Sequence, residues 1–128
     1  MVSTLDTLTE ILERLNKTGR VNASIVADDE GFLIASAVRP GIDEKVAAVM
    51  GSIIHDAADR AKDELGLGAI RDITLRCKEG TLVCKSTILK EGRPVVLAAL
   101  IPKETRFFIR AVNSALREIE TALQELEI

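Results

Sequence analysis

Residues 43–65 read DEKVAAVMGSIIHDAADRAKDEL, a stretch whose apolar side chains recur at helical spacing over about twice the length of an average helix. One apolar row on this helix consists of Val46, Val49, Met50, Ile53, Ala57 and Ala61. A second row lies beside it and consists of Ala47, Gly51, Ile54 and Ala58. Together the rows cover roughly half of the circumference, whereas a single contact face needs about 100°. The helix is therefore expected to contact two partners.

Gly51 indicates which row lies on the sheet and which faces a second helix. A glycine inside a helix costs about 1 kcal/mol relative to alanine, so its presence favours a close approach of another backbone. We predict that the row of large side chains lies on a sheet and that the row with Gly51 faces a second helix, for which a copy of this helix in a dimer is the favoured source. Two alternatives remain open: Gly51 is merely tolerated, or another helix of the same chain supplies the contact.

Seven further elements follow from apolar periodicity and turn residues. The predicted helices are Thr4 to Lys17, capped by Ser3, and Thr105 to Leu126; the predicted strands are Asn22 to Asp28, Phe32 to Val38, Ile70 to Cys77, Thr81 to Ile88 and Pro94 to Ile101. Residues 94–101, PVVLAALI, are apolar throughout, which indicates a central strand covered by helices on both faces. Residues 1–128 are thus predicted to form one domain with the element order α-β-β-α-β-β-β-α.

The composition argues against several classes of function. With 47% apolar and 29% charged residues, the chain is neither a disordered nor a membrane protein. A net charge of −3, the absence of Trp and Tyr, and only three Phe provide neither a basic surface nor a stacking platform for nucleic acid. The sequence shows no basic and apolar leader and no apolar run of about 18 residues. We therefore expect a cytoplasmic protein that binds neither nucleic acid nor membrane.

The side chains that could carry out chemistry are few and scattered. His55, the only histidine, is predicted to lie on the polar side of the long helix as a surface residue. Cys77 and Cys84 lack metal-site spacing, and buried thiols are favoured over a disulfide. Phe107 and Phe108 are predicted to be core residues. Since no nucleophile with a base, metal-ligand spacing or phosphate-binding motif occurs, we expect no enzyme, no metal and no cofactor.

Three stretches together resemble the Roadblock family, the group of dynein light chain and MglB-like proteins. They are the hairpin IVADDEGFLIAS at residues 25–36, the helix MGSIIHDAADRAKDELGLG at residues 50–68, and VVLAAL at residues 95–100 before the last helix. The resemblance covers nearly the whole chain and rests on the order and spacing of turn and packing residues; longin and profilin domains share a related layered plan. It implies an α+β fold with a single five-stranded antiparallel sheet, the long helix on one face and the two terminal helices on the other.

The resemblance also implies homodimers. In them the strand Ile70 to Cys77 pairs with its mate, so that the sheet continues across the dimer, and the two long helices lie side by side. This agrees with the row of small residues and removes an exposed sheet edge. The dimer interface is accordingly assigned to Ala47, Gly51, Ile54, Ala58, Asp72, Ile73, Thr74 and Leu75. A heterodimer with a paralogue is the alternative.

Roadblock family members act as partners of Ras-like small GTPases, some as activators like MglB, or as adaptors in dynein and lysosomal assemblies. MglB-type members reshape the GTPase active site. This requires a higher affinity for the GTPase conformation in which the GTPase's own catalytic groups are aligned. The resemblance implies a GTPase-binding surface on the outer row of the long helix, formed by Ser52, His55, Asp56, Asp59, Lys62 and Asp63.

We therefore predict a homodimeric regulator or scaffold of a Ras-like GTPase that has no chemistry of its own. The alternative is a structural adaptor that holds peptides by strand addition or helix docking. A small-molecule sensor is less favoured, because it needs an internal pocket with polar groups and only Ser24, Ser36 and Ser86 offer inward polar side chains.

Overall fold

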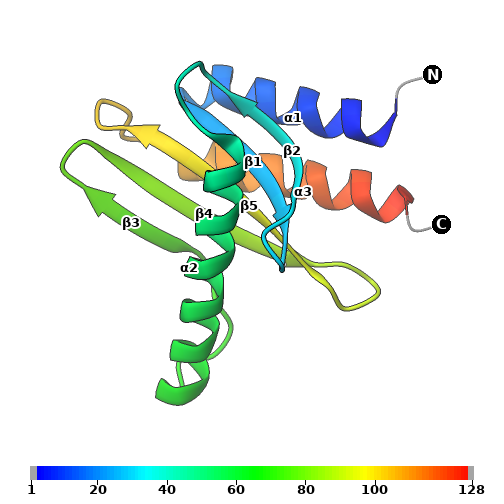
Figure 1. The fold of residues 1–128 in the computed structure, drawn as a ribbon, viewed down its shortest axis with the longest axis vertical. Helices are drawn as coiled ribbons and strands as arrows, with labels where there is room; N and C mark the ends of the chain where they lie inside the picture. Colours follow the sequence, from blue (N-terminus) through cyan, green and yellow to red (C-terminus); the bar gives the residue numbers. More distant parts are fainter. Residues whose placement is uncertain (1–2, 127–128) are drawn as a thin grey trace.

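A five-stranded antiparallel sheet separates the helices into two layers in the computed structural model, which describes residues 3–126 (Figure 1). The elements in chain order are α1 (Thr4–Thr18), β1 (Ala23–Asp28), β2 (Leu33–Val38), α2 (Glu44–Leu65), β3 (Ile73–Cys77), β4 (Gly80–Ile88), β5 (Pro94–Pro102) and α3 (Ile109–Leu126). The predicted element order and the α+β class with one five-stranded sheet are confirmed.

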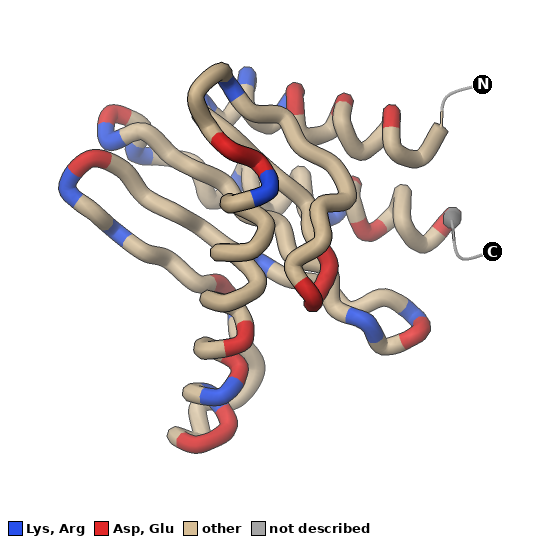
Figure 2. Tube along the Cα trace, viewed as in Figure 1, with Lys and Arg blue, Asp and Glu red and all other residues tan. Residues whose placement is uncertain are grey.

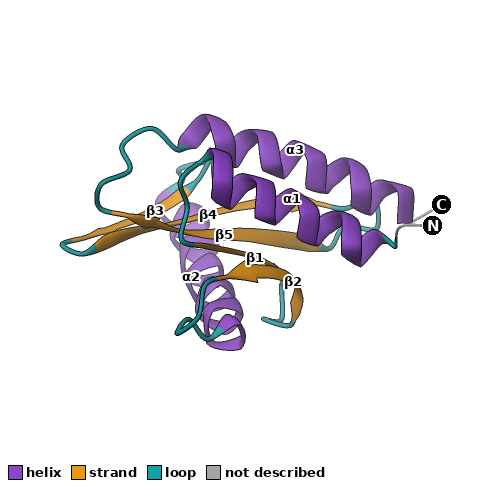
Figure 3. Ribbon diagram, turned by 90° about the horizontal axis from the view of Figure 1, so that it is seen from above, coloured by secondary structure: helices purple, strands orange, loops and turns teal. Residues whose placement is uncertain are grey.

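The central strand is β5, as its apolar sequence predicts. The strand order is β2-β1-β5-β4-β3, and residues 95–99 of β5 are buried. The helices α1 and α3 cover one face of the sheet, and α2 lies on the other (Figure 3). Because both faces of β5 are covered, the strand carries no alternation of apolar and polar residues.

The larger core lies between the sheet and the helices α1 and α3. Leu8 and Leu12 of α1 and Ile119 of α3 are fully buried there, together with Val26 and Leu97 of the sheet. The α1 helix begins at the predicted cap, where the amide of Asp6 donates to Ser3 Oγ over 3.1 Å. These two antiparallel helices form the outer layer of this side of the molecule.

The long helix α2 is limited by specific caps at both ends. In its first turn, the backbone amides of Lys45 and Val46 donate hydrogen bonds to the carboxylate of Asp43. Its last turn ends at Gly66, whose positive φ of 65° suits a residue without a side chain. Figure 1 shows that the C-terminal end of α2 extends beyond the strands.

Two predicted boundaries differ from the structure by more than one residue. The strand β3 begins at Ile73 and not at Ile70, and α3 begins at Ile109 and not at Thr105. The later start of α3 separates two adjacent phenylalanines: Phe108 is buried, whereas Phe107 is 94% exposed. The prediction that Phe107 belongs to the core is therefore wrong.

The two cysteines also differ from expectation. Cys84 is buried in β4, but Cys77 is exposed, and both are free thiols. In the β3–β4 ladder Cys77 pairs with Gly80 and Cys84 pairs with Ile73, so the two cysteines do not face each other. The prediction of two buried thiols is correct for Cys84 only, because β3 is an edge strand whose side chains are mostly exposed.

Candidate functional site

The helix α2 places its small residues on the sheet and its large apolar residues in solvent. Ala48, Gly51 and Ser52 are the buried residues of α2. The apolar side chains that are about half exposed, between 46% and 54%, are Val46, Val49, Met50 and Ile53. The prediction that these large residues lie on the sheet is therefore wrong, because the row with Gly51 takes that place.

The reason for this orientation is a close approach between α2 and the sheet. A Cβ at position 51 would lie 3.8 Å from the Cβ of Ala98 on β5. Gly31, in the turn between β1 and β2, approaches α2 so closely that a Cβ there would lie 3.4 Å from Ser52 Cβ. Ala47 also packs against the small core on this face. Large side chains in this row would hold the helix away from the sheet.

Polar contacts between distant segments fix the rotation of α2. Ser52 Oγ donates to the carbonyl of Asp29 over 3.0 Å, and His55 Nε2 lies 3.2 Å from Ser86 Oγ on β4. A further hydrogen bond joins Ser36 Oγ on β2 to the carboxylate of Glu44. These hydrogen bonds connect β2, β4 and the turn between β1 and β2 to one side of α2, so the opposite side of the helix faces outward.

The residues assigned from the sequence to a helix interface are consequently not all accessible. Gly51 is buried within its own chain, and Ala47, Ile54 and Ala58 are half-buried. In β3, Thr74 and Leu75 are exposed and Ile73 is half-buried, and Asp72, just before the strand, is also exposed. The strand part of the predicted interface is mostly accessible, whereas the helix part is buried or half-buried within its own chain.

We call the exposed apolar face of this side the α2–β3 surface, made of Val46, Val49, Met50, Ile53, Ile73 and Leu75. Ile73 packs against the small core beneath α2, and Leu75, two residues further along the strand, points to the same face. Within residues 3–126, β3 pairs with β4 alone, so its other edge has free backbone groups. An apolar helix face beside an open strand edge is typical of a surface that binds another polypeptide.

The residues predicted to bind a GTPase divide into two groups. Ser52 and His55 face the sheet, so their assignment to the outer row is wrong. Asp56 and Asp63 are exposed on the C-terminal half of α2, where charged residues of both signs alternate (Figure 2). Lys62 Nζ lies 2.8 Å from Asp63 and 3.1 Å from Asp59.

Two side chains within residues 3–126 have shifted pKa values, those of Lys62 and Cys84. The hydrogen bonds from Lys62 to Asp63 and to Asp59 raise the pKa of this lysine and keep it charged. Burial raises the pKa of the Cys84 thiol to about 11, so this cysteine stays protonated near neutral pH. Among residues 3–126, no three potential metal-ligating side chains converge. No helix in this described part is both long and apolar enough to cross a membrane.

Within residues 3–126, the chain forms an α+β domain whose sheet ends in the edge strands β2 and β3 and whose helix α2 has an exposed apolar face. The chain belongs to the Roadblock/LC7 family, whose domain model matches residues 7–87. The resemblance seen in the sequence is thereby confirmed.

Several proteins of known sequence or structure are similar to this chain. Two uncharacterized proteins of Methanocaldococcus jannaschii, MJ0310 and MJ1340, are each 29% identical over 100 residues, which cover 78% of this chain and 84% of each relative. Myxococcus xanthus MglB matches with a TM-score of 0.82 at 20% identity, over 95% of this chain and 91% of MglB. The gliding protein MglB of Thermus thermophilus matches with a TM-score of 0.83 at 11% identity, over 98% and 94% of the two chains. At these identities the structural matches establish a shared fold.

The sequence did not predict that the row with Val46, Val49, Met50 and Ile53 is the exposed one. One signal was available: Ser52 and His55 follow Ala48 and Gly51 at helical spacing, so one face combines small residues with side chains that can bond to turns and strands. Side-chain size alone favoured burial of the row that contains Val46, Met50 and Ile53.

Proposed function

We propose that the protein is a homodimeric regulator or scaffold of a Ras-like small GTPase and has no catalytic residues of its own. The observation that carries this proposal is the α2–β3 surface on a Roadblock/LC7 domain with the fold of MglB. The likeness to MglB-type activators favours a GTPase as partner over other kinds of protein.

In the proposed dimer, β3 pairs with β3 of a second copy. Asp72 and Thr74, two residues apart, supply backbone groups at the open edge, Leu75 adds an apolar side chain, and the sheet continues through the interface. The half-exposed side chains of α2 meet their copies above this junction. The β3–β3 pairing and the contact between the α2 helices each cover a surface that would otherwise favour aggregation. These surfaces are an open strand edge and an exposed apolar helix face.

The proposed GTPase contact uses the exposed end of α2, with Asp56, Asp59, Lys62 and Asp63. A regulator without catalytic residues acts by binding one conformation of the GTPase more tightly than another, and it shifts the equilibrium by no more than that difference in affinity. An adaptor would bind both nucleotide states equally.

The dimer is tested with a matched pair of isoleucines. Ile53 on α2 and Ile88 at the end of β4 are both more than half exposed. We expect Ile53→Asp to give a monomer in size-exclusion chromatography with light scattering, because two copies of a charge would be buried in the interface. Ile88→Asp should leave the dimer unchanged. A dimer that survives Ile53→Asp, or a wild-type protein that is monomeric at micromolar concentration, contradicts the proposed interface.

The regulatory role is tested by GTP turnover of a Ras-like GTPase from the same genome, with and without excess of the protein. Acceleration of turnover that is lost in Asp59→Lys and Asp63→Lys supports a regulator. A dimer that binds the GTP-bound and GDP-bound forms with equal affinity supports the adaptor alternative. Copurification with a second Roadblock chain in a one-to-one ratio would favour the heterodimer over the homodimer.

A further inference from the structure

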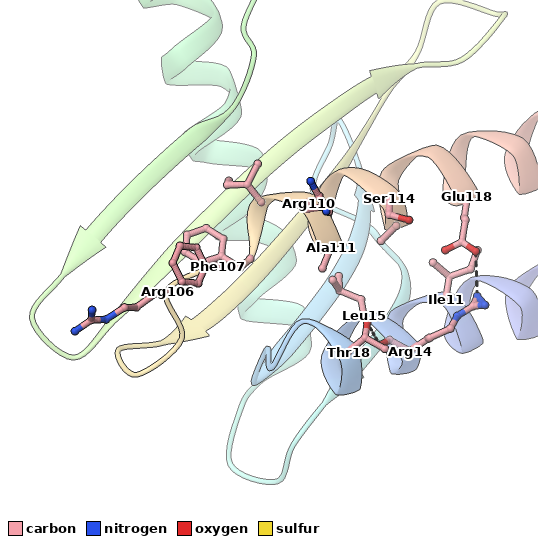
Figure 4. A pocket seen from close by; sticks show the side chains of 13 residues that line it. Ile11, Arg14, Leu15, Thr18, Arg106, Phe107, Arg110, Ala111, Ser114 and Glu118 are labelled. Atoms are coloured by element: carbon pink, nitrogen blue, oxygen red, sulfur yellow. Dashed lines mark hydrogen bonds and ion pairs between the residues drawn. The ribbon is translucent and has the colours of Figure 1, made fainter.

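A groove runs between α1 and α3, on the opposite side of the sheet from α2. Its volume is about 790 Å³ (Figure 4). Its floor consists of Ile11, Leu15, Ala111 and Ala115, and its rim includes Phe107 and Ile109. Ala111 and Ala115 of α3 have small side chains, so space remains between α1 and α3. This groove belongs to no part of the proposed dimer or GTPase contact.

Phe107 stands at one end of the groove with its ring in solvent. It is 94% exposed, and the neighbouring Ile109 is 40% exposed, whereas Phe108 between them is buried. Phe108 occupies the core and so turns the adjacent side chains outward at the start of α3. Exposed aromatic residues next to a hollow are enriched at the centres of protein interfaces. The apolar rim therefore lacks a partner within the described chain.

The net charge of the residues that line the groove is positive, whereas the net charge of the whole protein is negative. Three arginines line it, Arg14, Arg106 and Arg110, against one acidic residue, Glu118. Glu118 lies 3.3 Å from Arg14 and compensates that charge. Over residues 3–126, no carboxylate lies within 4.0 Å of the guanidinium of Arg106 or Arg110. The chain has a net charge of −3, so this positive rim is a local feature.

Arg20 extends the positive charge at the same end. It lines an adjoining hollow with Arg106, Phe107 and Glu104. Its φ of 53° makes it the only described residue other than glycine with a positive φ. Its carbonyl accepts a hydrogen bond from Thr105 Oγ1 over 2.9 Å, which joins the end of α1 to the segment before α3.

We propose that this groove binds an acidic amphipathic helix of another protein. Apolar residues of that helix would pack on Phe107, Ile109 and the floor, and its carboxylates would pair with Arg106 and Arg110. The hollow shape favours a helix over a lipid surface, because a membrane contacts protruding residues but cannot fill a valley between two helices. The proposal adds a second binding surface to the one on α2, so the domain could join two partners on opposite faces.

The test uses a fluorescent synthetic peptide made of repeats of Glu-Leu-Leu-Glu-Ala-Leu-Glu, and a second peptide in which every Glu is Lys. We expect the acidic peptide to bind the wild-type protein in an anisotropy titration and the basic peptide to bind at least about tenfold more weakly. Phe107→Ala, and separately the double change Arg106→Glu with Arg110→Glu, should each weaken binding of the acidic peptide by roughly tenfold or more. All three positions are exposed, so these variants should fold normally.

The controls repeat the same chemical changes elsewhere. Phe32→Ala removes another exposed phenylalanine, and Arg39→Glu reverses another exposed arginine, both at the ends of β2. Neither should change the affinity for the acidic peptide. The groove variants should also leave the dimer mass and GTP turnover unaltered, so that failure of this proposal is distinguishable from failure of the proposed function.

Four results would overturn the proposal. One is equal affinity for the acidic and basic peptides, and another is an affinity that the groove variants do not change. The third is the absence of peptide binding up to about 1 mM, an affinity too weak for a specific contact. Binding to vesicles containing phosphatidylserine that depends on Phe107, without peptide binding, would replace the helix by an anionic membrane and so also contradict the proposal.

Discussion

The orientation of α2 leads to a definite expectation for Gly51. Because this residue faces β5 and not a second helix, replacing it by alanine should stabilise the monomer fold and leave the dimer intact. The added methyl would lie 3.8 Å from Ala98 Cβ, which is ordinary van der Waals contact. Gly51→Leu should do the opposite, because the space that accepts one methyl does not accept three further carbons.

The expected magnitudes follow from this geometry. Alanine is favoured over glycine in a helix interior by about 1 kcal/mol, and a buried methyl in contact adds up to about 0.8 kcal/mol. Gly51→Ala should therefore raise the free energy of unfolding by about 1 to 2 kcal/mol, and the melting temperature by at least about 3 °C for a domain of this size. Gly51→Leu should lower the free energy of unfolding by about 1 to 3 kcal/mol, because it forces α2 away from the sheet.

The assay is urea unfolding of the three proteins at one fixed protein concentration, since the stability of a dimer depends on concentration. Light scattering of the same samples reports the oligomeric state. If Gly51→Ala lowers the free energy of unfolding, or converts a dimer into a monomer, then Gly51 faces a second helix and the described orientation of α2 is incorrect.

Three further predictions concern stability and are checked by urea unfolding. Gly19→Ala should lower the free energy of unfolding by roughly 1 to 3 kcal/mol, because a Cβ there would lie 2.8 Å from the carbonyl oxygen of Leu15, and a backbone atom cannot move aside; no loss would show that the end of α1 is free to shift. Asp43→Ala should cost about 1 kcal/mol, because it removes the acceptor for two amides of the first turn of α2, whereas Asp43→Asn should retain most of the stability. Burial raises the pKa of Cys84 from 9.0 to about 11, so its contribution to stability is complete below pH 9 and is lost as the pH rises to about 11, by roughly 2 to 3 kcal/mol in total. In Cys84→Ala this decline should be smaller by that amount, and identical pH profiles would contradict the assigned cause.

Local signals explain why the element order could be predicted. The central strand β5 is recognisable from PVVLAALI alone, because only a strand covered on both faces tolerates so many apolar residues in succession. The cap of α1 at Ser3 is a short-range feature of the sequence, and the structure contains it. The Roadblock resemblance rests on the same turn and packing residues.

Long-range contacts explain what could not be predicted. Both rows of α2 satisfy helical amphipathicity, and the choice between them depends on Ala98, Asp29 and Ser86, which lie far away in the sequence. In the same way, Phe107 and Phe108 are equivalent until the first turn of α3 is placed against the sheet.

The sequence by itself thus determined the strands, the helices, the cap at Ser3 and the family, because periodicity and turn chemistry act within a few residues. Only the tertiary structure decided which face of α2 is exposed and that arginines and Phe107 surround a groove between α1 and α3. The physical reason is that hydrophobic burial has no direction of its own. It requires that apolar surface be covered, but the close approach of particular backbones decides which surface is covered within the chain and which is left for a partner.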